Sequence, residues 1–173
     1  LMGCASEPVS DIEVAEPQSN GPEITLATWN VEHLAFPIDS GCKPRTAEEI
    51  AELKAYAQSI NADVVALQEV ASAKAVELLF PPEQWQIIMS TRPDSESYSC
   101  RGSGNTSTQQ KIAFAVKKQL NVTKVVSVDD LNLGRLGLRY GLEIQLESDF
   151  GPLSLLNVHL KSGCFVDNFL TSD

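Results

Sequence analysis

Three apolar, strand-like runs in this sequence each end in polar residues for which a buried strand has no structural use. The runs are 25–33 (TLATWNVEH), 62–70 (ADVVALQEV) and 155–163 (LLNVHLKSG). Their polar residues of interest are Asn30, Glu69 and His159. In α/β proteins, strand ends that face a common crevice are where ligands bind. We therefore expect these three side chains to converge around one site.

The residue types suggest the chemistry of that site. Glu69 ends a run that is otherwise buried, and a buried ionised carboxylate needs a partner. One possible partner is a lysine or arginine from a facing layer; the other is a metal ion. An amide oxygen, a carboxylate and an imidazole together suit a hard cation and a phosphate. The sequence therefore favours Mg²⁺ as the cofactor, with Mn²⁺ as the alternative.

Each of the remaining polar residues also has a purely structural interpretation. Asn30 could cap a bulge by bonding its own backbone. Strand alternation puts His159 on one face with Asn157 and Lys161, a composition that does not predict core packing. His159 could instead be a surface residue of a half-exposed strand. Alternation puts His33 on the face opposite Asn30, which favours a structural role for it.

The three segments together resemble the endonuclease/exonuclease/phosphatase superfamily, which comprises metal-dependent phosphoesterases related to secreted deoxyribonucleases. The resemblance rests on the Trp-Asn-x-Glu-His string at 29–33, the Gln-Glu pair at 68–69 and the Asn-x-His string at 157–159. It covers residues 24–165. It implies an α/β (α+β) fold, a four-layer α/β/β/α sandwich of the deoxyribonuclease-I-like type.

The resemblance also implies roles for single residues. Asn30 would orient the attacking water or touch the metal, Glu69 would bind the metal, and His159 would bond the scissile phosphate. Arg139, in the string GLRYG at 137–141, resembles a family position where an arginine enters the crevice. A surface ion pair is the alternative for Arg139. Lys161 is a second candidate for the substrate phosphate.

Two of the family's later motifs have no match in these 173 residues: a Gly-Asp-Phe-Asn string and a closing Ser-Asp-His string. In the family they supply residues near the attacked phosphorus and the pair that activates water. We therefore expect residues 23–173 to be the N-terminal part of a larger domain, truncated at its C-terminus, with the second half of the sandwich incomplete. A phosphodiesterase also needs a water activator, so we expect this chain alone to be inactive.

The N-terminus predicts a location for the protein. The string Leu1-Met-Gly-Cys4 resembles the end of a bacterial lipobox, and residues 5–22 are acidic and proline-bearing, as in a flexible tether. These features predict a membrane attachment through a lipid anchor on Cys4, in the bacterial cell envelope, on its periplasmic or extracellular face. Secretion without an anchor is the alternative, with Cys4 a stray cysteine near a disordered end.

Cysteine spacing and net charge narrow the possibilities further. Cys42, Cys100 and Cys164 lie in loop-like sequence without a zinc-binding spacing, so disulfides are expected, with the pairing open. The net charge of −10 argues against a surface that grips nucleic acid strongly. It does not exclude a nuclease whose metal supplies the local positive charge. No apolar run approaches the roughly 20 residues of a membrane-spanning helix.

The hydrophobic pattern predicts a mixed α/β domain. Thr46 and Glu49 form a capping box that begins a helix, and Asn61 is a left-handed stop. Residues 90–110 are a long polar loop of the kind that is often functional. The expected strands are 23–34, 64–70, 85–89, 111–118, 122–128, 138–147 and 153–161, and the expected helices are 46–60 and 72–79.

These features predict an exported, magnesium-dependent phosphodiesterase that hydrolyses its substrate by direct attack of water. An endonuclease or exonuclease acting on nucleic acid is the first expectation. A lipid- or inositol-phosphate phosphoesterase of the same fold is the second, although residues 90–110 contain no apolar finger for a lipid. A non-catalytic surface lipoprotein that serves as a binding module is the third.

Overall fold

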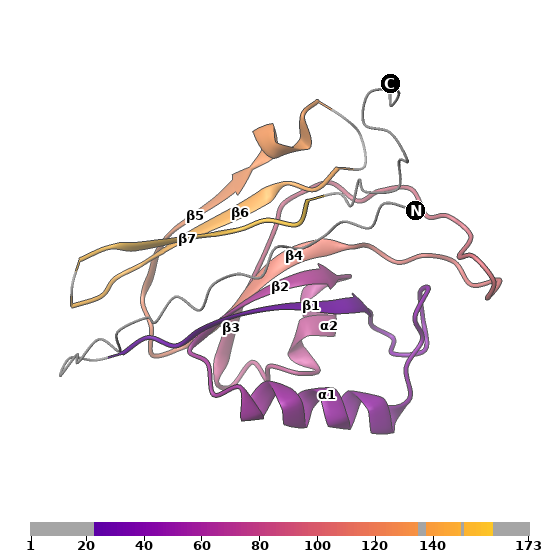
Figure 1. Cartoon of the computed structure of the whole chain (residues 1–173), viewed down its shortest axis with the longest axis horizontal. Coiled ribbons are helices and arrows are strands. Elements are labelled where there is room, and N and C mark those ends of the chain that lie inside the picture. Colours follow the sequence, from indigo (N-terminus) through magenta and orange to yellow (C-terminus); the bar gives the residue numbers. More distant parts are fainter. Residues whose placement is uncertain (1–22, 135–137, 150, 161–173) are drawn as a thin grey trace, which may run out of the picture.

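The computed structural model describes residues 23–134, 138–149 and 151–160. The predicted lipobox, the predicted tether, Lys161 and Cys164 lie outside these residues. The described elements, in chain order, are β1 (Leu26–Leu34), α1 (Ala47–Ser59), β2 (Val64–Val70), α2 (Ala73–Glu77), β3 (Trp85–Met89), β4 (Lys111–Lys117), β5 (Val122–Val128), the 3₁₀ helix η1 (Asp129–Asn132), β6 (Gly141–Leu146) and β7 (Leu153–Asn157). They form a layer of helices and two sheets (Figure 1).

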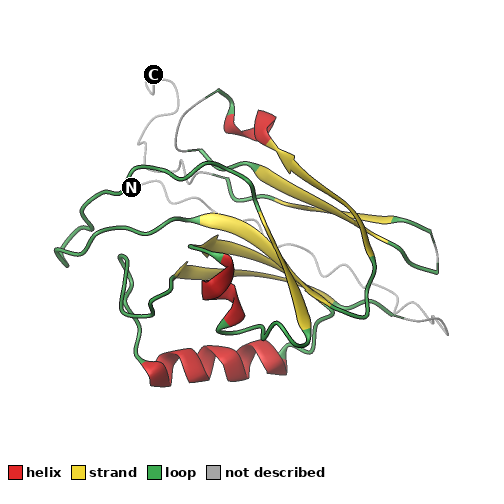
Figure 2. Cartoon of the chain, turned by 180° about the vertical axis from the view of Figure 1, so that it is seen from behind, coloured by secondary structure: helices red, strands yellow, loops and turns green. Residues whose placement is uncertain are grey.

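The first sheet has the strand order β1-β2-β4-β3, and the second has the order β5-β6-β7. β1 and β2 are parallel and are joined by α1, whereas the other neighbouring strands are antiparallel. β6 and β7 form the predicted hairpin. Figure 2 shows α1 and α2 on the face of the first sheet that points away from the second sheet.

The helix ends follow the local sequence. Thr46 Oγ1 accepts a hydrogen bond from the backbone N–H of Glu49 (3.2 Å), and the Glu49 carboxylate accepts one from the N–H of Thr46 (2.7 Å). This is the predicted capping box. Asn61 follows the helix with φ 49°, the left-handed conformation expected of a stop. The two predicted helices are thus confirmed, with the second shorter than expected.

A hydrophobic core lies between each pair of neighbouring layers. The first lies between the helices and the first sheet and includes Val65, Leu67 and Phe80. The second lies between the sheets and includes Phe114 and Ile144. The predicted α/β class and the two facing sheets are confirmed, and the described residues supply three of the four layers expected of the sandwich. Among the described residues, no helix is long and apolar enough to cross a membrane.

A buried polar network joins the two sheets. Asn157, at the end of β7, is 3% exposed and donates from Nδ2 to the backbone oxygens of Leu67 (3.0 Å) and Ala113 (2.9 Å). Its Oδ1 accepts a hydrogen bond from Gln68 Nε2 at 2.8 Å. Gln68 Nε2 also lies 3.2 Å from Thr28 Oγ1, so the network reaches β1. It fixes the end of the second sheet against the middle of the first.

The sequence interpretation of Asn157 as part of a face outside the core is therefore wrong. Asn157 follows Leu153 and Leu155, which both pack in the second core, on the same side of β7. A polar residue is accommodated at this depth because all its hydrogen-bonding groups have partners, which removes most of the cost of burying an amide.

We expect Asn157→Leu to lower the free energy of unfolding by about 2–4 kcal/mol, because it removes the hydrogen bonds that bridge the sheets, among them the shortest bond of the buried Gln68 amide. Urea denaturation measures this change. Ser154→Ala, at an exposed position of the same strand, is the control and should stay within about 0.5 kcal/mol of the parent protein. Equal stability of the two variants would contradict the importance of the network.

Candidate active site

β2 loses its regular alternation at Glu69. Gln68 pairs with Ile112 of β4 and Val70 pairs with Lys111, so one extra residue stands on β2. That residue is Glu69, whose φ is 62°. A bulge of this kind re-aims a side chain.

The packing of the helix-side core shows the same one-residue shift in the alternation of β2. Val65 and Leu67 belong to the helix-side core, and strict alternation would place residue 69 there as well. Val70 occupies the next position in that core instead. The bulge thus buries Val70 with the helices and releases the Glu69 carboxylate from the apolar layer.

β1 has a corresponding irregularity. Asn30 pairs with Gln68 and Leu34 pairs with Val70, so β1 uses more residues than β2 over the same stretch. Glu32 and His33 take φ values of 47° and 57°. Positive φ is unusual for residues other than glycine, and such residues concentrate at functional sites.

Side chains from the following loop hold this irregular part of β1. Arg45 Nη2 donates to the backbone oxygens of Val31 and Glu32, both at 2.8 Å. Asn30 Oδ1 accepts from the N–H of Glu32 at 3.0 Å, the local backbone bond considered from the sequence. Lys43 Nζ lies 3.0 Å from Glu32 Oε1, and this hydrogen bond lowers the pKa of Glu32 below its ordinary value.

The Glu69 carboxylate lies at the centre of a group of nitrogen atoms. Asn30 Nδ2 donates to its Oε1 at 3.1 Å. His159 Nε2 is 3.7 Å from the same oxygen, and His33 Nε2 is 3.8 Å from Oε2. The Glu69 side chain is 15% exposed. The expected convergence of residues 30, 69 and 159 therefore occurs in space, while the roles assigned to them stay predictions.

His33 departs from the sequence interpretation. Alternation placed it with Trp29 and Val31, away from Asn30. Trp29 and Val31 do pack on the helix-side core, but Leu34 takes the next position there. The two residues with positive φ turn His33 toward Glu69, so it lies within the site.

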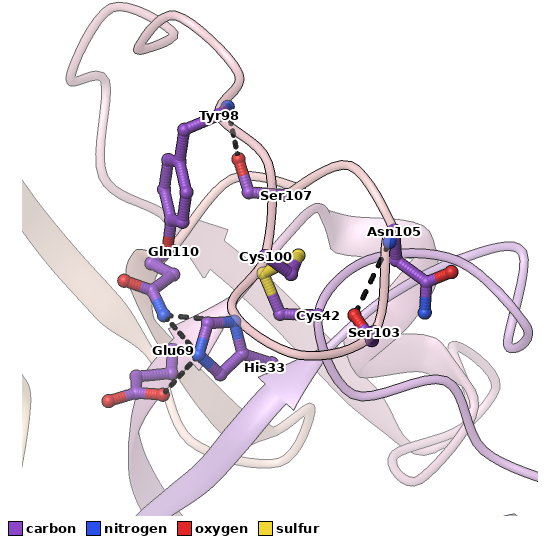
Figure 3. The surroundings of a disulfide bond; sticks show 9 residues. All are labelled: His33, Cys42, Glu69, Tyr98, Cys100, Ser103, Asn105, Ser107 and Gln110. Carbon is purple, nitrogen blue, oxygen red and sulfur yellow. Dashed lines mark hydrogen bonds and ion pairs between the residues drawn. A yellow bond between two sulfur atoms is a disulfide. The ribbon is translucent and has the colours of Figure 1, made fainter.

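Gln110 is a site residue that the sequence did not reveal. Its amide nitrogen lies 2.9 Å from Nδ1 and 2.7 Å from Nε2 of His33, and its oxygen accepts from Arg139 Nη2 at 2.9 Å. Figure 3 shows Gln110 above the pair formed by His33 and Glu69. The only feature of the sequence that could have pointed to Gln110 is its position directly before the buried strand β4. Arg139, bonded to Gln110, lines the cavity next to this group, and Lys161 is outside the described residues.

Burial lowers the proton affinities of two basic side chains at the site, His159 and Arg139. Burial lowers the pKa of His159, the nearby Arg139 lowers it further, and Glu69 opposes both. Burial likewise lowers the pKa of Arg139, against the attraction of Glu69. His159 Nδ1 and Arg139 Nε are buried and have no hydrogen-bond partner in the part of the chain that the structure describes.

The donor set fits a hard cation that keeps most of its own ligands. Glu69 supplies carboxylate oxygens, and Asn30 supplies an amide oxygen with one lone pair beyond its bond to Glu32. Among the described residues, no three histidine, cysteine or acidic side chains form a group that could hold a metal ion. Mg²⁺ commonly binds through one or two protein oxygens and takes water and phosphate for the rest.

A disulfide between Cys42 and Cys100 joins the two loops beside the site (Figure 3). It confirms that disulfides form and supplies the pairing that the sequence left open. The loops also touch at Gly41, where φ is 82° and an added Cβ would stand 2.7 Å from Thr108 Oγ1. Only glycine fits there without movement. The 90–110 loop is thus fastened to the segment that supports the irregular end of β1.

Several solved structures share this fold. D. rerio TDP2 in complex with a single-strand DNA product matches with a TM-score of 0.57 and 17% identity, covering 82% of this chain and 48% of that one. The human Nocturnin catalytic domain with bound sulfate matches with a TM-score of 0.55 and 18% identity, covering 82% and 52%. An endonuclease/exonuclease/phosphatase family protein from Leptotrichia buccalis matches with a TM-score of 0.50 and 12% identity, covering 80% and 55%.

At these identities the comparison establishes the fold. The chain adopts the mixed α/β fold of endonuclease/exonuclease/phosphatase proteins over most of its length. It spans about half the length of the chains it matches. No protein-family model and no curated protein sequence matches it.

The environment of His159 predicts an abnormal titration. In the metal-free protein we expect its pKa, measured by NMR, to lie below the ordinary value of about 6.5. Glu69→Gln should lower it further, and Arg139→Gln should raise it. The neutral form is favoured in the folded state, so this histidine's contribution to stability is present above pH of about 6.5 and is lost as the pH falls. The chain has only 2 histidines, so His33→Gln assigns the resonances. A normal pKa for His159 would contradict the described burial.

The disulfide should stabilise the protein through the unfolded state. It joins residues 58 positions apart, and chain entropy predicts that Cys42→Ala/Cys100→Ala lowers the free energy of unfolding by about 4 kcal/mol. Urea denaturation of the oxidised protein measures the loss. Cys164→Ala is the control and should leave stability unchanged if Cys42 and Cys100 pair with each other.

Proposed function

We propose that this chain carries the metal-binding and phosphate-binding residues of a magnesium-dependent phosphodiesterase that acts on nucleic acid. The observation that carries the proposal is the Glu69 carboxylate, released from the core by a bulge and surrounded by Asn30, His33 and His159. A partly buried carboxylate placed on strained backbone is costly for a structural role alone. It suits a group that binds a cation.

Glu69 and Asn30 would hold Mg²⁺, or Mn²⁺, through their side-chain oxygens. When bound, such an ion neutralises charge on a phosphate and lowers the pKa of a bound water. His159 would donate from its ring to an oxygen of the scissile phosphate. Its lowered pKa keeps it neutral near pH 7, so it acts as a hydrogen-bond donor while the ion supplies the positive charge.

Arg139 would supply the second contact to phosphate. Its guanidinium is oriented by the bond to Gln110, which is in turn held against His33. A planar, oriented guanidinium suits phosphate oxygens because it offers parallel donors. Lys161, two residues beyond His159, would add to the same field.

The related folds support a phosphodiester substrate. The D. rerio TDP2 structure contains a single-strand DNA product, and the human Nocturnin structure contains a sulfate anion. Those ligands belong to those proteins. The DNA product makes nucleic acid, before lipid or inositol phosphates, the substrate to test first.

The Cys42–Cys100 disulfide supports a location outside the reducing cytosol, because disulfides persist in oxidising compartments. We extend the proposal to an exported enzyme held in the bacterial cell envelope by a lipid on Cys4. Mass spectrometry of the protein from a membrane fraction would detect the modification. An unmodified Cys4 in a secreted product would favour release instead.

We expect Glu69→Gln to weaken binding of Mg²⁺ or Mn²⁺ by at least about 100-fold, because it removes the charged ligand while keeping the side-chain shape. Isothermal titration calorimetry is the primary readout, since the sequence predicts little turnover by these residues alone. Glu32→Gln is the matched control: Glu32 lies on the neighbouring strand, and its carboxylate pairs with Lys43 instead. It should bind the metal as the parent protein does.

Activity is tested in parallel with plasmid DNA, RNA, sphingomyelin and inositol phosphates. Hydrolysis of DNA or RNA that needs Mg²⁺ and is lost in Glu69→Gln would support the proposal. Cleavage of sphingomyelin or inositol phosphates alone would show that the substrate is a lipid or inositol phosphate and not nucleic acid. Equal metal binding by Glu69→Gln and the parent protein would overturn the site itself and favour a non-catalytic binding module.

A further inference from the structure

The disulfide beside the site joins two segments that are supported in different ways. One of them, the 90–110 loop, leaves β3 and returns in β4, so the first sheet holds both of its ends. At one end the N–H of Ser90 donates to the backbone oxygen of Ile112 at 3.0 Å. At the other end Lys111 pairs with Val70 of β2. This loop is therefore a fixed point to which another segment can be fastened.

The part of the loop that carries Cys100 is a narrow ribbon. The N–H of Tyr98 donates to Ser107 Oγ at 2.9 Å (Figure 3), and the N–H of Ser107 donates to the backbone oxygen of Tyr98 at 2.8 Å. Between them, the N–H of Cys100 donates to the backbone oxygen of Asn105 at 2.8 Å. Cys100 is 7% exposed. Its sulfur is thus held by an ordered ribbon on the anchored loop.

The second segment, residues 35–45, runs from the irregular end of β1 to α1. Arg45 turns back to that end and donates from Nη2 to the backbone oxygens of Val31 and Glu32, both at 2.8 Å. Cys42 lies three positions before Arg45. The disulfide therefore fastens the segment that supports β1 to the ribbon of the anchored loop.

The end of β1 passes this support on to the site. Glu32 and His33 have positive φ, which persists only where contacts hold it. The N–H of Glu32 donates to Asn30 Oδ1 at 3.0 Å, and Asn30 Nδ2 donates to the Glu69 carboxylate at 3.1 Å. A change in the backbone at Glu32 therefore moves the oxygen donors of the site. The hydrogen bonds of Arg45 are what the disulfide protects.

The compartment in which the chain lies decides whether this disulfide exists. Its formation removes one hydrogen atom from each thiol, joins the two sulfur atoms and converts a disulfide of an exchange partner into two thiols. Reducing compartments keep such thiols apart, whereas oxidising ones let the disulfide persist. Cys42 is partly exposed, which gives an exchange partner a point of attack. The support of β1 thus depends on the redox state of the surroundings.

We propose that the Cys42–Cys100 disulfide is a redox switch for the Glu69 site and that it acts through Arg45. In the oxidised chain Arg45 holds the end of β1, and the donors of Asn30 and Glu69 are set for a cation. In the reduced chain the segment with Arg45 is released, and the affinity for the cation falls. The inference rests on the proposed function and adds its regulation. A nuclease with this switch stays without its metal in the reducing compartment where it is made and becomes competent after export.

The first experiment compares the two redox states of the full chain in which Cys4→Ala and Cys164→Ala leave only the pair of the switch. Isothermal titration calorimetry measures Mn²⁺ binding before and after reduction with a phosphine. Reduction should weaken binding by at least about tenfold, the scale expected when a residue that orients a metal ligand is lost. Reoxidation with oxidised glutathione should restore it. Equal affinity in the two states would overturn the switch.

The second experiment tests the route through Arg45. In the oxidised chain, Arg45→Gln should weaken Mn²⁺ binding as much as reduction does. Reducing this variant should then add no more than about a twofold loss, because changes that act through one contact are not additive. Lys43→Gln is the matched control: it removes the same charge from the same segment, but Lys43 contacts the Glu32 side chain and not the backbone. It should bind as the parent protein does. Additive losses, or an equal loss in Lys43→Gln, would overturn the role of Arg45.

Hydrogen exchange, followed by NMR without metal, gives a readout that does not depend on the proposed function. Reduction should speed exchange of the Glu32 N–H by about tenfold or more, while the amide of Leu67 in the middle of β2 stays protected. Loss of protection at both amides would show global unfolding and overturn a local switch. If Arg45→Gln does not fold, this measurement on the parent chain decides.

The two proposals fail in different ways. Faster exchange at Glu32 on reduction, with no Mn²⁺ binding in either redox state, would overturn the proposed function alone. Mn²⁺ binding that is lost in Glu69→Gln but is the same in both redox states would overturn the switch alone.

Discussion

The irregular ends of β1 and β2 are the constraint on which the site depends. Each strand departs from alternation where it approaches Glu69, through residues whose φ values are positive. A left-handed backbone conformation costs a residue other than glycine about 1–2 kcal/mol, so contacts with the surrounding structure must stabilise it. Arg45 stabilises the irregular end of β1 by donating hydrogen bonds to two backbone oxygens, and Val70 stabilises that of β2 by packing in the core. The apolar layer remains continuous while Glu69 and His33 are freed to meet at the sheet edge.

The second sheet completes this arrangement through Asn157. The amide of Asn157 is bonded to the backbone of β2 and β4 and to Gln68, the residue directly before the bulge. His159 follows two residues later, just beyond the end of β7, and its Nε2 lies 3.7 Å from Glu69 Oε1, so the anchored end of β7 holds the ring near Glu69. Gln68 belongs to the inter-sheet network, and the next residue, Glu69, belongs to the site. The packing of the two sheets and the site are therefore linked through adjacent residues.

Charge is distributed unevenly around this centre. Glu69 faces neutral donors from Asn30 and His159, with Arg139 close enough to affect the titration of His159. Arg92, which is 7% exposed, lines the same cavity as Gln110 and Arg139. A chain with a net charge of −10 thus concentrates buried positive charge beside one carboxylate.

The sequence by itself determined the order of elements, both helix starts and the meeting of Asn30, Glu69 and His159, because capping residues, hydrophobic runs and strand ends are local signals. Only the tertiary structure decided the position of His33, the burial of Asn157 and the role of Gln110 as a bridge. Alternation assumes a regular strand, and a bulge shifts it without a mark in the sequence. A disulfide partner and a buried amide likewise depend on segments that meet only after the chain has folded.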